Sequence, residues 1–308
     1  MPPLKPSVMI TGFSGLLGGA LVREMKGRYD VLGVARRGPP DGVSCDLSDE
    51  EKVKALFKSH KPALVLHTAA YSDVDGCERE PKKAYKNNAL SCKYLSQACA
   101  THRVPWIYVS TDYVFGGRQR TPYREKDIPS PMNSYGLSKW CGEFYALSGG
   151  VSSAVVRTSW LFGPDSPANF VNAILRRLHQ EKKVAVLDDQ TDSPTSVKDL
   201  SQALMTIGEY LMTAHAQDPS TIRHDTFHVC NRGATTRYEM TVYLRDCLGL
   251  KGVDVEKVDR SRIQGRVALR APYLVMSTAH YEHFFKQRLR TWQESLKEYA
   301  EEVAACAS

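Results

Sequence analysis

A glycine-rich turn, ITGFSGLLGG at residues 10–19, follows the first apolar segment of the chain and decides the fold. Its Thr-Gly-x-x-Gly-x-x-Gly pattern begins at Thr11 and sets glycines at positions 12, 15 and 18. At a strand-to-helix junction these glycines permit a tight turn, close approach of backbone N–H groups to a pyrophosphate, and close helix packing, while the helix N-terminus favours an anion. The pattern predicts a dinucleotide site, although a glycine-rich turn without a ligand has the same sequence. The residues expected to contact the dinucleotide are Gly12, Phe13, Ser14, Gly15, Leu16 and Leu17.

Around this turn, short β-branched apolar runs alternate with amphipathic helical segments. Strands are expected at Val8–Thr11, Val31–Ala35, Val43–Cys45, Ala63–Thr68, Trp106–Ser110 and Ala154–Thr158. Helices are expected near 15–27, 49–60, 80–102 and 135–147, the second of them opened by a capping box over Ser48–Glu51. This alternation predicts an α/β fold with a Rossmann-type, doubly wound parallel sheet and right-handed crossovers.

The second expected strand ends in VLGVARRG at residues 31–38, with Arg36 and Arg37 where an NAD site usually has an acidic residue for the ribose 2′-hydroxyl. Two guanidinium groups suit a 2′-phosphate, because each can bind phosphate oxygens in pairs. The pair favours NADP(H) over NAD(H), although two solvated surface arginines would have the same sequence.

Later strand ends supply further candidates for the cofactor site. Asp46, with Leu47 beside it, either accepts a hydrogen bond from the adenine amino group or caps a helix. The strand LVLHTAAY contains His67, which we interpret as a core residue rather than a catalytic base. It ends in three residues expected to flank the cofactor, namely Ala69, Ala70 and Tyr71.

The alternation loosens after residue 165. A helix is expected near 168–181, a strand at Val184–Leu187, a loop (DDQTDSPTSVKDL) that leads into a helix, an irregular basic stretch over 250–290, and a last helix over 291–304. We expect residues 1–165, with about 190–232 returning to them, to form an NADP-binding Rossmann domain. Residues 166–189 and 233–308 are expected to form a smaller C-terminal α/β lobe that binds substrate in the cleft between the two parts.

Hydroxyl and acidic side chains follow the strand Trp106–Val109, and a Y-x-x-x-K pattern sets Tyr135 and Lys139 on one face of a helix. A tyrosine has an ordinary pKa of ~10, and an ammonium beside it would lower that pKa. Thr111 is expected to hydrogen-bond a substrate carbonyl, Tyr135 to protonate it, and Lys139 to tune Tyr135 and hold the nicotinamide ribose, with hydride coming from the nicotinamide.

Five blocks of sequence resemble the dTDP-4-dehydrorhamnose reductase family of the extended short-chain dehydrogenase/reductase superfamily. They are AAYSDVDGCEREP, STDYVFGG, PYREKDIPSPMNSYGLSKWCGE, VVRTSWLFG and DDQTDSPT, in the order of that family, and they lie within residues 8–200. The resemblance implies NADPH- or NADH-dependent reduction of the 4-keto group of a nucleotide-linked 6-deoxysugar. It implies Thr111, Tyr135 and Lys139 as the catalytic residues. It also implies substrate contacts from Val74, Thr111, Asp112, Tyr113 and Trp160.

A second family competes with the first. YREKDIPSPMNSYG and DPSTIRHDTFHVCNRGATTRYEM are also similar to the regulatory beta subunit of methionine adenosyltransferase. That resemblance implies NADP binding, a methionine adenosyltransferase catalytic subunit as partner, and no turnover. Thr111 and the intact RTSW of residues 157–160 favour the reductase. An epimerase or dehydratase that retains NAD would share the Tyr/Lys pair, but it would gain nothing from Arg36 and Arg37.

One segment departs from the reductase pattern. The family usually has an Arg-Pro pair near residue 270 that helps to bind the nucleotide-sugar, whereas this chain has ALRAPYLVM, with Ala271 before Pro272. The nearest arginine is Arg270, so we expect the contact to shift by one residue or to be lost.

Composition sets the outer limits. The chain has 308 residues, 42% hydrophobic and 24% charged, with a net charge of +7 and no basic run that suggests nucleic acid. Eight scattered cysteines without a C-x-x-C pair predict reduced thiols, and Asp188 and Asp189 predict a turn rather than a metal site. No leader sequence and no apolar stretch near ~20 residues are evident. We therefore expect a cytoplasmic protein with no membrane span and no metal, and a homodimer as one arrangement.

Overall fold

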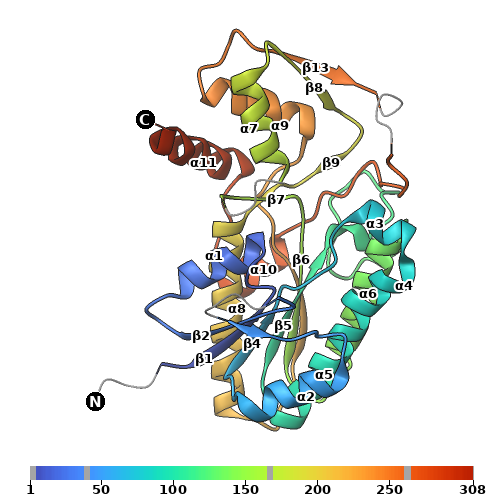
Figure 1. Ribbon diagram of the computed structural model, residues 1–308, viewed down its shortest axis with the longest axis vertical. Coiled ribbons are helices and arrows are strands. Elements are labelled where there is room, and N and C mark those ends of the chain that lie inside the picture. Colours follow the sequence, from blue (N-terminus) through green and yellow to red (C-terminus); the bar gives the residue numbers. More distant parts are fainter. Residues whose placement is uncertain (1–4, 38–41, 165–168, 260–264, 308) are drawn as a thin grey trace.

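The computed structural model of the chain describes residues 5–37, 42–164, 169–259 and 265–307 (Figure 1). Its main layer is a sheet in which every pairing is parallel, with the strand order β11-β6-β5-β4-β1-β2-β3. The strands are β1 (Ser7–Thr11), β2 (Asp30–Ala35), β3 (Val43–Ser44), β4 (Leu64–His67), β5 (Trp106–Thr111), β6 (Ser153–Thr158) and β11 (His224–His228). The order reverses between β1 and β4, as in a doubly wound Rossmann fold. The predicted fold class is confirmed.

Helices cover both faces of this sheet because successive strand residues point to opposite sides. In β1, Val8 and Ile10 pack with α1 (Leu16–Met25) and α8 (Val197–Gln217), whereas Met9 packs with α2 (Glu50–Ser59) and α5 (Ser91–His102). The helix α6 (Ser134–Leu147) lies beside α5 on the second face (Figure 1). No helix in the described part of the chain, the 21 residues of α8 included, is long and apolar enough to cross a membrane.

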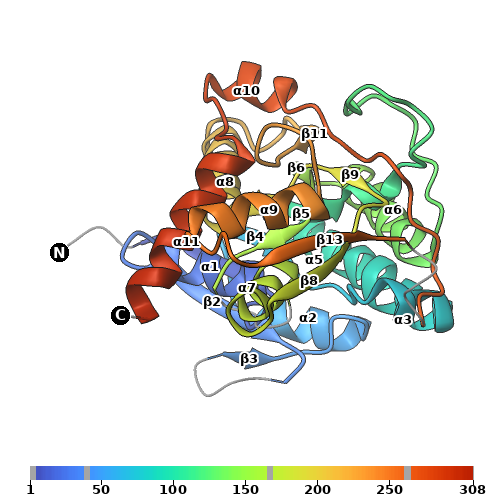
Figure 2. The same ribbon diagram turned by 90° about the horizontal axis from the view of Figure 1, so that it is seen from above.

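A smaller layer lies at one end of the sheet and is seen from above in Figure 2. Its two parallel strands are β8 (Lys183–Leu187) and β13 (Asp254–Val258). Three helices cover them, α7 (Phe170–Gln180), α9 (Arg237–Cys247) and α11 (Trp292–Ala307). Leu175, Leu244 and Leu296 meet in its core. The helix α10 (Ala279–Phe285) packs instead against β11 of the large sheet.

Two short pairings lie between the layers. β7 (Leu161–Phe162) pairs with β10 (Thr195–Ser196), and β9 (Thr191–Asp192) pairs antiparallel with β12 (Thr235–Thr236). They bring the chain after β6 and the loop after β8 to the carboxyl end of the large sheet.

Three local predictions need correction. The expected helix 80–102 is interrupted: α3 (Val74–Arg79) ends before Pro81, α4 (Pro81–Tyr85) follows, and a π-helical turn η1 (Lys86–Leu90) precedes α5. Pro81 starts a new helix because proline suits the first helical position. The cap of α2 is Asp49, which accepts from the N–H of Lys52, and not Ser48, which bonds to Asp46.

The stretch 250–290 is not irregular throughout. It contains β13, which pairs along its whole length with β8, and the helix α10. The strand was not evident from the sequence because its apolar residues Val255 and Val258 are separated by charged side chains, and its partner lies far along the chain.

Candidate active site

A cavity of about 840 Å³ lies where the carboxyl ends of β1, β2, β4, β5 and β6 meet. This is the place where open parallel sheets bind ligands, beside the reversal of strand order. Most of the residues that the sequence indicated lie in its wall: Gly12, Ser14, Gly15, Leu16, Leu17, Arg36, Asp46, Leu47, Ala69, Ala70, Tyr71, Val74, Thr111, Asp112, Tyr113, Tyr135, Lys139 and Trp160. Of the indicated residues that the structure describes, Phe13 and Arg37 lie outside this wall.

The glycine-rich turn has the shape that the sequence predicted. Gly12 has a φ of 70°, and a Cβ on it would lie 2.7 Å from the Cα of Ala69. A Cβ on Gly18 would collide with the carbonyl oxygen of Gly12. Gly15 caps α1 without a side-chain hydrogen bond, and the first turn of α1 contains no acidic residue. The helix N-terminus is therefore suited to an anion.

Phe13 and Arg37 were expected to contact the cofactor, but neither lies in the wall of the cavity. The Phe13 ring packs on Gly33, where an added Cβ would lie 2.7 Å from the ring, and on Gly42. Its side chain therefore fixes the turn against β2 instead of facing the cavity. Arg37 is exposed.

Arg36 and Asp46 form a polar edge of the cavity. The Arg36 Nε lies 4.0 Å from the Asp46 Oδ1, and the guanidinium also donates to Asn87. Asp46 accepts from the backbone N–H of Ser48 at 3.1 Å and from its hydroxyl at 2.7 Å. Burial raises the pKa of Asp46, but the Ser48 hydrogen bonds and the Arg36 charge lower it further, so the net shift is downward.

Tyr135 and Lys139 lie one turn apart on α6, whose N-cap Asn133 accepts from the N–H of Gly136 at 2.8 Å. The Lys139 Nζ donates to the Val109 carbonyl at 2.7 Å. Burial lowers the pKa of Lys139 to about 8. The Tyr135 ring meets the Tyr113 ring edge-on, with centroids 5.8 Å apart.

The pKa of Tyr135 shifts in the direction opposite to our expectation. Burial, and then the Asp112 carboxyl, raise the pKa of Tyr135, whereas the Thr111 hydroxyl lowers it. The sequence does not reveal how deeply the phenol is buried. Burial, and not the Lys139 ammonium that we expected to lower this pKa, is the largest cause of the shift. The phenol is consequently protonated at neutral pH.

Thr111 ends β5 and begins a chain of buried acids. Its hydroxyl donates to the Asp112 Oδ1 at 2.7 Å and accepts from the Tyr113 N–H at 3.2 Å. Behind Asp112 lies Asp192 of β9, which is fully buried. Burial first, and then the Asp192 carboxyl, raise the pKa of Asp112 well above its ordinary value. Sequence reasoning missed Asp192, although it lies within the block DDQTDSPT.

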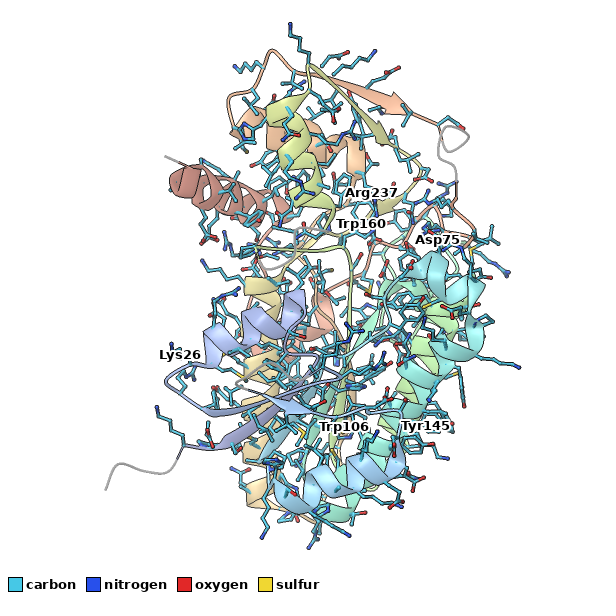
Figure 3. The ribbon with its side chains drawn as sticks, viewed as in Figure 1. Lys26, Asp75, Trp106, Tyr145, Trp160 and Arg237 are labelled. Carbon is cyan, nitrogen blue, oxygen red and sulfur yellow. The ribbon has the colours of Figure 1, made fainter. Side chains whose placement is uncertain are left out.

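Trp160 and Arg237 close the cavity toward the smaller layer (Figure 3). Trp160 has a φ of 37°, a region that costs a non-glycine residue about 1–3 kcal/mol. The Arg237 guanidinium lies 5.0 Å from the centroid of the Trp160 ring and 4.8 Å from that of Phe170. Arg237 begins α9, and no motif in the sequence indicates that this helix reaches the cavity.

The departure around Ala271 also has a structural outcome. Arg270 forms a double ion pair with Asp75, at 2.6 and 2.9 Å, and Asp75 also accepts from the N–H groups of Val267 and Ala268. The Arg270 guanidinium holds the pKa of Asp75 well below its usual range. Arg270 therefore ties its segment to α3, and within the described part of the chain it is not a cavity-wall residue. Figure 3 labels Asp75 at this junction.

The remaining candidates are structural. His67 is fully buried and bonds through Nδ1 to the Thr11 hydroxyl at 2.7 Å, and burial lowers its pKa to about 3, which confirms a neutral core histidine. Asp188 pairs with Lys257 at 2.7 Å, and Asp189 with Arg266 at 2.6 Å. Across the described residues, no group of three or more His, Cys, Asp or Glu could hold a metal ion. The cysteines whose side chains are described, at 45, 77, 92, 99, 141, 230 and 247, are free.

The reversed parallel sheet, the glycine-rich turn and the Tyr135–Lys139 pair beside one cavity define an extended short-chain dehydrogenase/reductase. Within this class, the family model of the RmlD substrate binding domain matches residues 6–305. The chain belongs to the dTDP-4-dehydrorhamnose reductase family, and it is 32% identical over 300 residues to the dTDP-4-dehydrorhamnose reductase of Streptomyces griseus, covering 96% of this chain and 94% of that protein.

Two further relatives represent the alternatives. The crystal structure of dTDP-4-dehydrorhamnose reductase from Bacillus anthracis in complex with NADP is 29% identical, covers 97% of this chain and 100% of its own, and has a TM-score of 0.86. Methionine adenosyltransferase 2 subunit beta of Danio rerio is 33% identical over 248 residues, which cover 79% of this chain and 74% of that protein. Both resemblances seen in the sequence are confirmed.

Proposed function

We propose that this protein is an NADPH-dependent reductase of a nucleotide-linked 4-keto-6-deoxysugar, similar to dTDP-4-dehydrorhamnose reductase. The observation that carries the proposal is the meeting of Thr111, Tyr135 and Lys139 with the glycine-rich turn in one cavity. A dinucleotide and a small carbonyl substrate could share a cavity of about 840 Å³, which lies in the range of small-molecule sites.

The cavity wall fits NADP(H) in several places. The pyrophosphate would lie at the N-terminus of α1, where Gly12 and Gly18 leave no room for a side chain. Arg36 would bind the 2′-phosphate, Asp46 would accept from the adenine amino group, and Lys139 would hold the nicotinamide ribose. The residues Leu47, Ala69, Ala70 and Tyr71 would flank the cofactor. When bound, NADPH supplies the hydride.

The chain's own residues supply the proton and the alignment. Tyr135 carries a proton at neutral pH, because burial raises its pKa, and it would pass that proton to the carbonyl oxygen of the substrate. Lys139 would keep a positive charge near the ribose and the phenol. Thr111 would align Tyr135 and the substrate at the end of β5.

The sugar nucleotide would lie toward the smaller layer. We propose residues 1–165, with about 190–232, as the cofactor domain, and 166–189 with 233–308 as the substrate lobe. Val74, Asp112, Tyr113 and Trp160 would contact the substrate. Arg237 in the same wall, which sequence reasoning missed, is suited to an anionic group of it.

The beta-subunit relative supports a second candidate, an NADP-binding regulatory subunit of methionine adenosyltransferase without turnover. An apolar stripe on α6, formed by Leu137, Trp140 and Phe144, is exposed and could contact such a subunit or a second copy of this chain. Free thiols suit a cytoplasmic location for either candidate.

Single-turnover NADPH oxidation tests the choice. We expect loss of NADPH absorbance with dTDP-4-dehydrorhamnose or another nucleotide-linked 4-ketosugar, and a loss about 10²–10⁴ times slower with Tyr135→Phe. Oxidation should not require a methionine adenosyltransferase catalytic subunit. If no ketosugar in the panel is reduced and the chain instead binds and activates that subunit, the regulatory candidate replaces the reductase.

A further inference from the structure

The two aspartates beneath the cavity, Asp112 and Asp192, occupy unusual surroundings. We propose that they hold a single proton between their Oδ2 atoms and that this acid pair positions the Thr111 hydroxyl for the reaction. The functional part of this inference rests on the proposed reductase activity, whereas the shared proton does not.

The hydrogen-bond partners of the acid pair are divided unevenly. The Oδ1 of Asp112 accepts from Thr111 at 2.7 Å, and the Oδ1 of Asp192 accepts from the N–H of Ser193 at 2.7 Å. Among the described residues, neither Oδ2 atom has a hydrogen-bond partner, and the Ser159 hydroxyl, which lies beside Asp192 and lowers its pKa, does not complete a hydrogen bond either. The two carboxyls are within hydrogen-bonding contact of each other, and their residues are 2% and 0% exposed.

One proton between the two Oδ2 atoms would satisfy both of them at once. Two charged carboxylates in contact in a buried place repel each other strongly, so the pair keeps a proton that two separate aspartates would lose. A buried acceptor without a donor costs about 1–3 kcal/mol in free energy. The shared proton avoids this cost at both Oδ2 atoms.

The other titratable groups around the acid pair do not remove the need for this proton. Arg237 of α9 faces Asp192 and lowers its pKa, but burial outweighs it and the pKa of Asp192 is raised. Tyr113, Tyr135 of α6 and Cys230 after β11 also face the pair. Each of these three would become negative on ionisation, so none of them can compensate a second carboxylate.

The shared proton determines the direction of the Thr111 hydrogen bond. With that proton on the Oδ2 side, the Oδ1 of Asp112 remains an acceptor and the Thr111 hydroxyl donates to it. The Thr111 oxygen then keeps a lone pair for the Tyr113 N–H, and the Thr111 side chain lies within hydrogen-bonding contact of the Tyr135 phenol. Asp112 and Asp192 are therefore positioning residues that act through Thr111 on Tyr135.

Infrared spectroscopy detects the proton without any turnover. Protein carrying ¹³C-carboxyl aspartate should show, at pH 7, the carbonyl band of a protonated aspartate, and Asp192→Asn should lack that band. The asparagine amide can donate to the Asp112 Oδ2 in place of the proton. Asp112→Asn should lose the same band and provides a second variant if Asp192→Asn does not fold.

The matched control is Asp49→Asn, which keeps an equally good cap on α2 and removes a carboxylate whose pKa is lowered. It should retain the protonated band. A wild-type protein without the band, or Asp192→Asn with the band intact, would overturn the shared proton.

The pH profile tests the positioning role. The kcat/KM of the wild type should fall at high pH in two steps, one as Lys139, whose pKa is about 8, loses its proton and one as the acid pair loses its proton. Only the step of the acid pair should be absent in Asp192→Asn, whereas both steps should be present in Asp49→Asn. Asp112→Asn should lower kcat about tenfold with little change in KM, the loss expected for one hydrogen bond. An unchanged alkaline limb in Asp192→Asn would refute the positioning role. A protein that turns over no ketosugar yet shows the infrared result would refute only the proposed function.

Discussion

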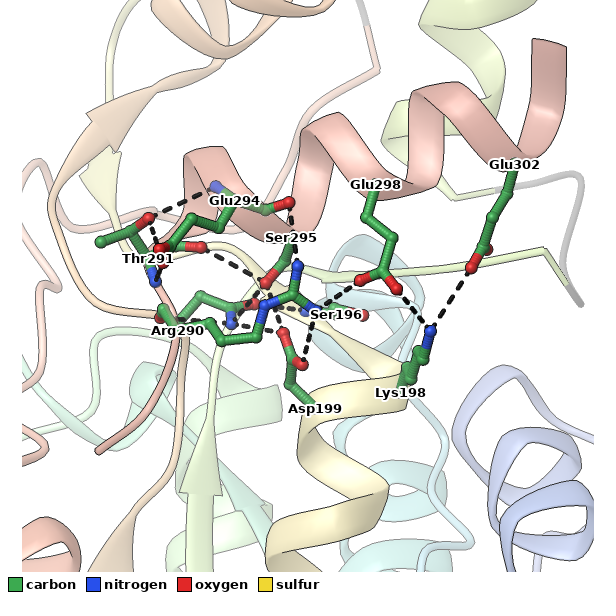
Figure 4. Close-up of polar contacts among 10 residues, drawn as sticks. Ser196, Lys198, Asp199, Arg290, Thr291, Glu294, Ser295, Glu298 and Glu302 are labelled. Atoms are coloured by element: carbon green, nitrogen blue, oxygen red, sulfur yellow. Dashed lines mark hydrogen bonds and ion pairs between the residues drawn. The ribbon is translucent and has the colours of Figure 1, made fainter. Parts of the chain in front are cut away.

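Two polar clusters, each built around a buried aspartate, lie near the start of α8, and they are built differently. The staple, formed by Asp199, Asn231, Arg290, Ser295 and Glu298, joins α8 to α11 (Figure 4). The cavity floor, formed by Thr111, Asp112 and Asp192, lies at the end of β5.

In the staple, the carboxyl oxygens of Asp199 are matched by donors. Asn231 donates to it at 2.7 Å, Ser295 donates to the same oxygen, and Arg290 reaches the other oxygen at 3.4 Å. In the cavity floor and the wall above it, the described groups without a hydrogen-bond partner include the Oδ2 atoms of both aspartates and the Nε of Arg237. A structural cluster satisfies its own groups, whereas a site leaves groups for a proton or a ligand to satisfy.

Tyr135→Phe should separate the two regions most strongly. Turnover should fall by about 10²–10⁴, because the general acid is lost, while the ring and its contact with Tyr113 remain. Stopped-flow NADPH oxidation measures the loss, and NADPH titration and urea unfolding should stay near the wild type. A variant that reduces substrate at the normal rate would remove Tyr135 from the mechanism.

Asp199→Ala should produce the reverse pattern in the staple. Loss of the shared acceptor leaves Asn231 and Ser295 with only their contacts to each other and to backbone carbonyls, and it should cost about 3 kcal/mol in the free energy of unfolding. Urea denaturation measures this, and kcat of the folded fraction should be retained. Glu302→Ala is the control, because its ion pair with Lys198 is exposed and should contribute less than ~1 kcal/mol. Equal losses in both variants would contradict the distinction.

Arg36→Ala should weaken NADPH binding about tenfold and leave NADH binding unchanged, because only NADPH has the 2′-phosphate. Arg37→Ala is the matched control, since Arg37 is exposed and lies outside the cavity wall. Fluorescence titration of both cofactors checks the pair of variants. Equal weakening of NADPH and NADH by Arg36→Ala would exclude 2′-phosphate recognition at this position.

The acid pair should make the free energy of unfolding depend on pH. Its folded-state pKa is raised, so above about pH 4 the unfolded aspartates have lost a proton that the folded pair retains. The free energy of unfolding should therefore fall as pH rises toward the raised pKa, by at most ~1.4 kcal/mol per pH unit. Asp192→Asn should remove this component. Urea denaturation at pH 5 to 8 measures the free energy of unfolding of the wild type and of Asp192→Asn. The same slope against pH in both proteins would contradict the shared proton.

The sequence predicted what is local or repeated. The glycine-rich turn, the βαβ alternation and the Tyr135–Lys139 spacing depend on neighbours along the chain, and they were confirmed in the fold. Asp192 and Arg237 were missed because they reach the site through a long-range pairing. Asp192 lies in β9, which pairs with β12, and β12 leads directly into α9, where Arg237 is the first residue. The direction of the Tyr135 pKa shift was wrong for a related reason, since burial depends on the whole fold.

The segment between Gly265 and Tyr273 is tied at two points. Arg266 binds Asp189 of the loop after β8, and Arg270 binds Asp75 of α3, each at 2.6 Å. The arginine side chains of these pairs are only 9% and 10% exposed, so dissolved salt screens them weakly. The segment therefore links the loop after β8 to α3 through two ion pairs that added salt should weaken little.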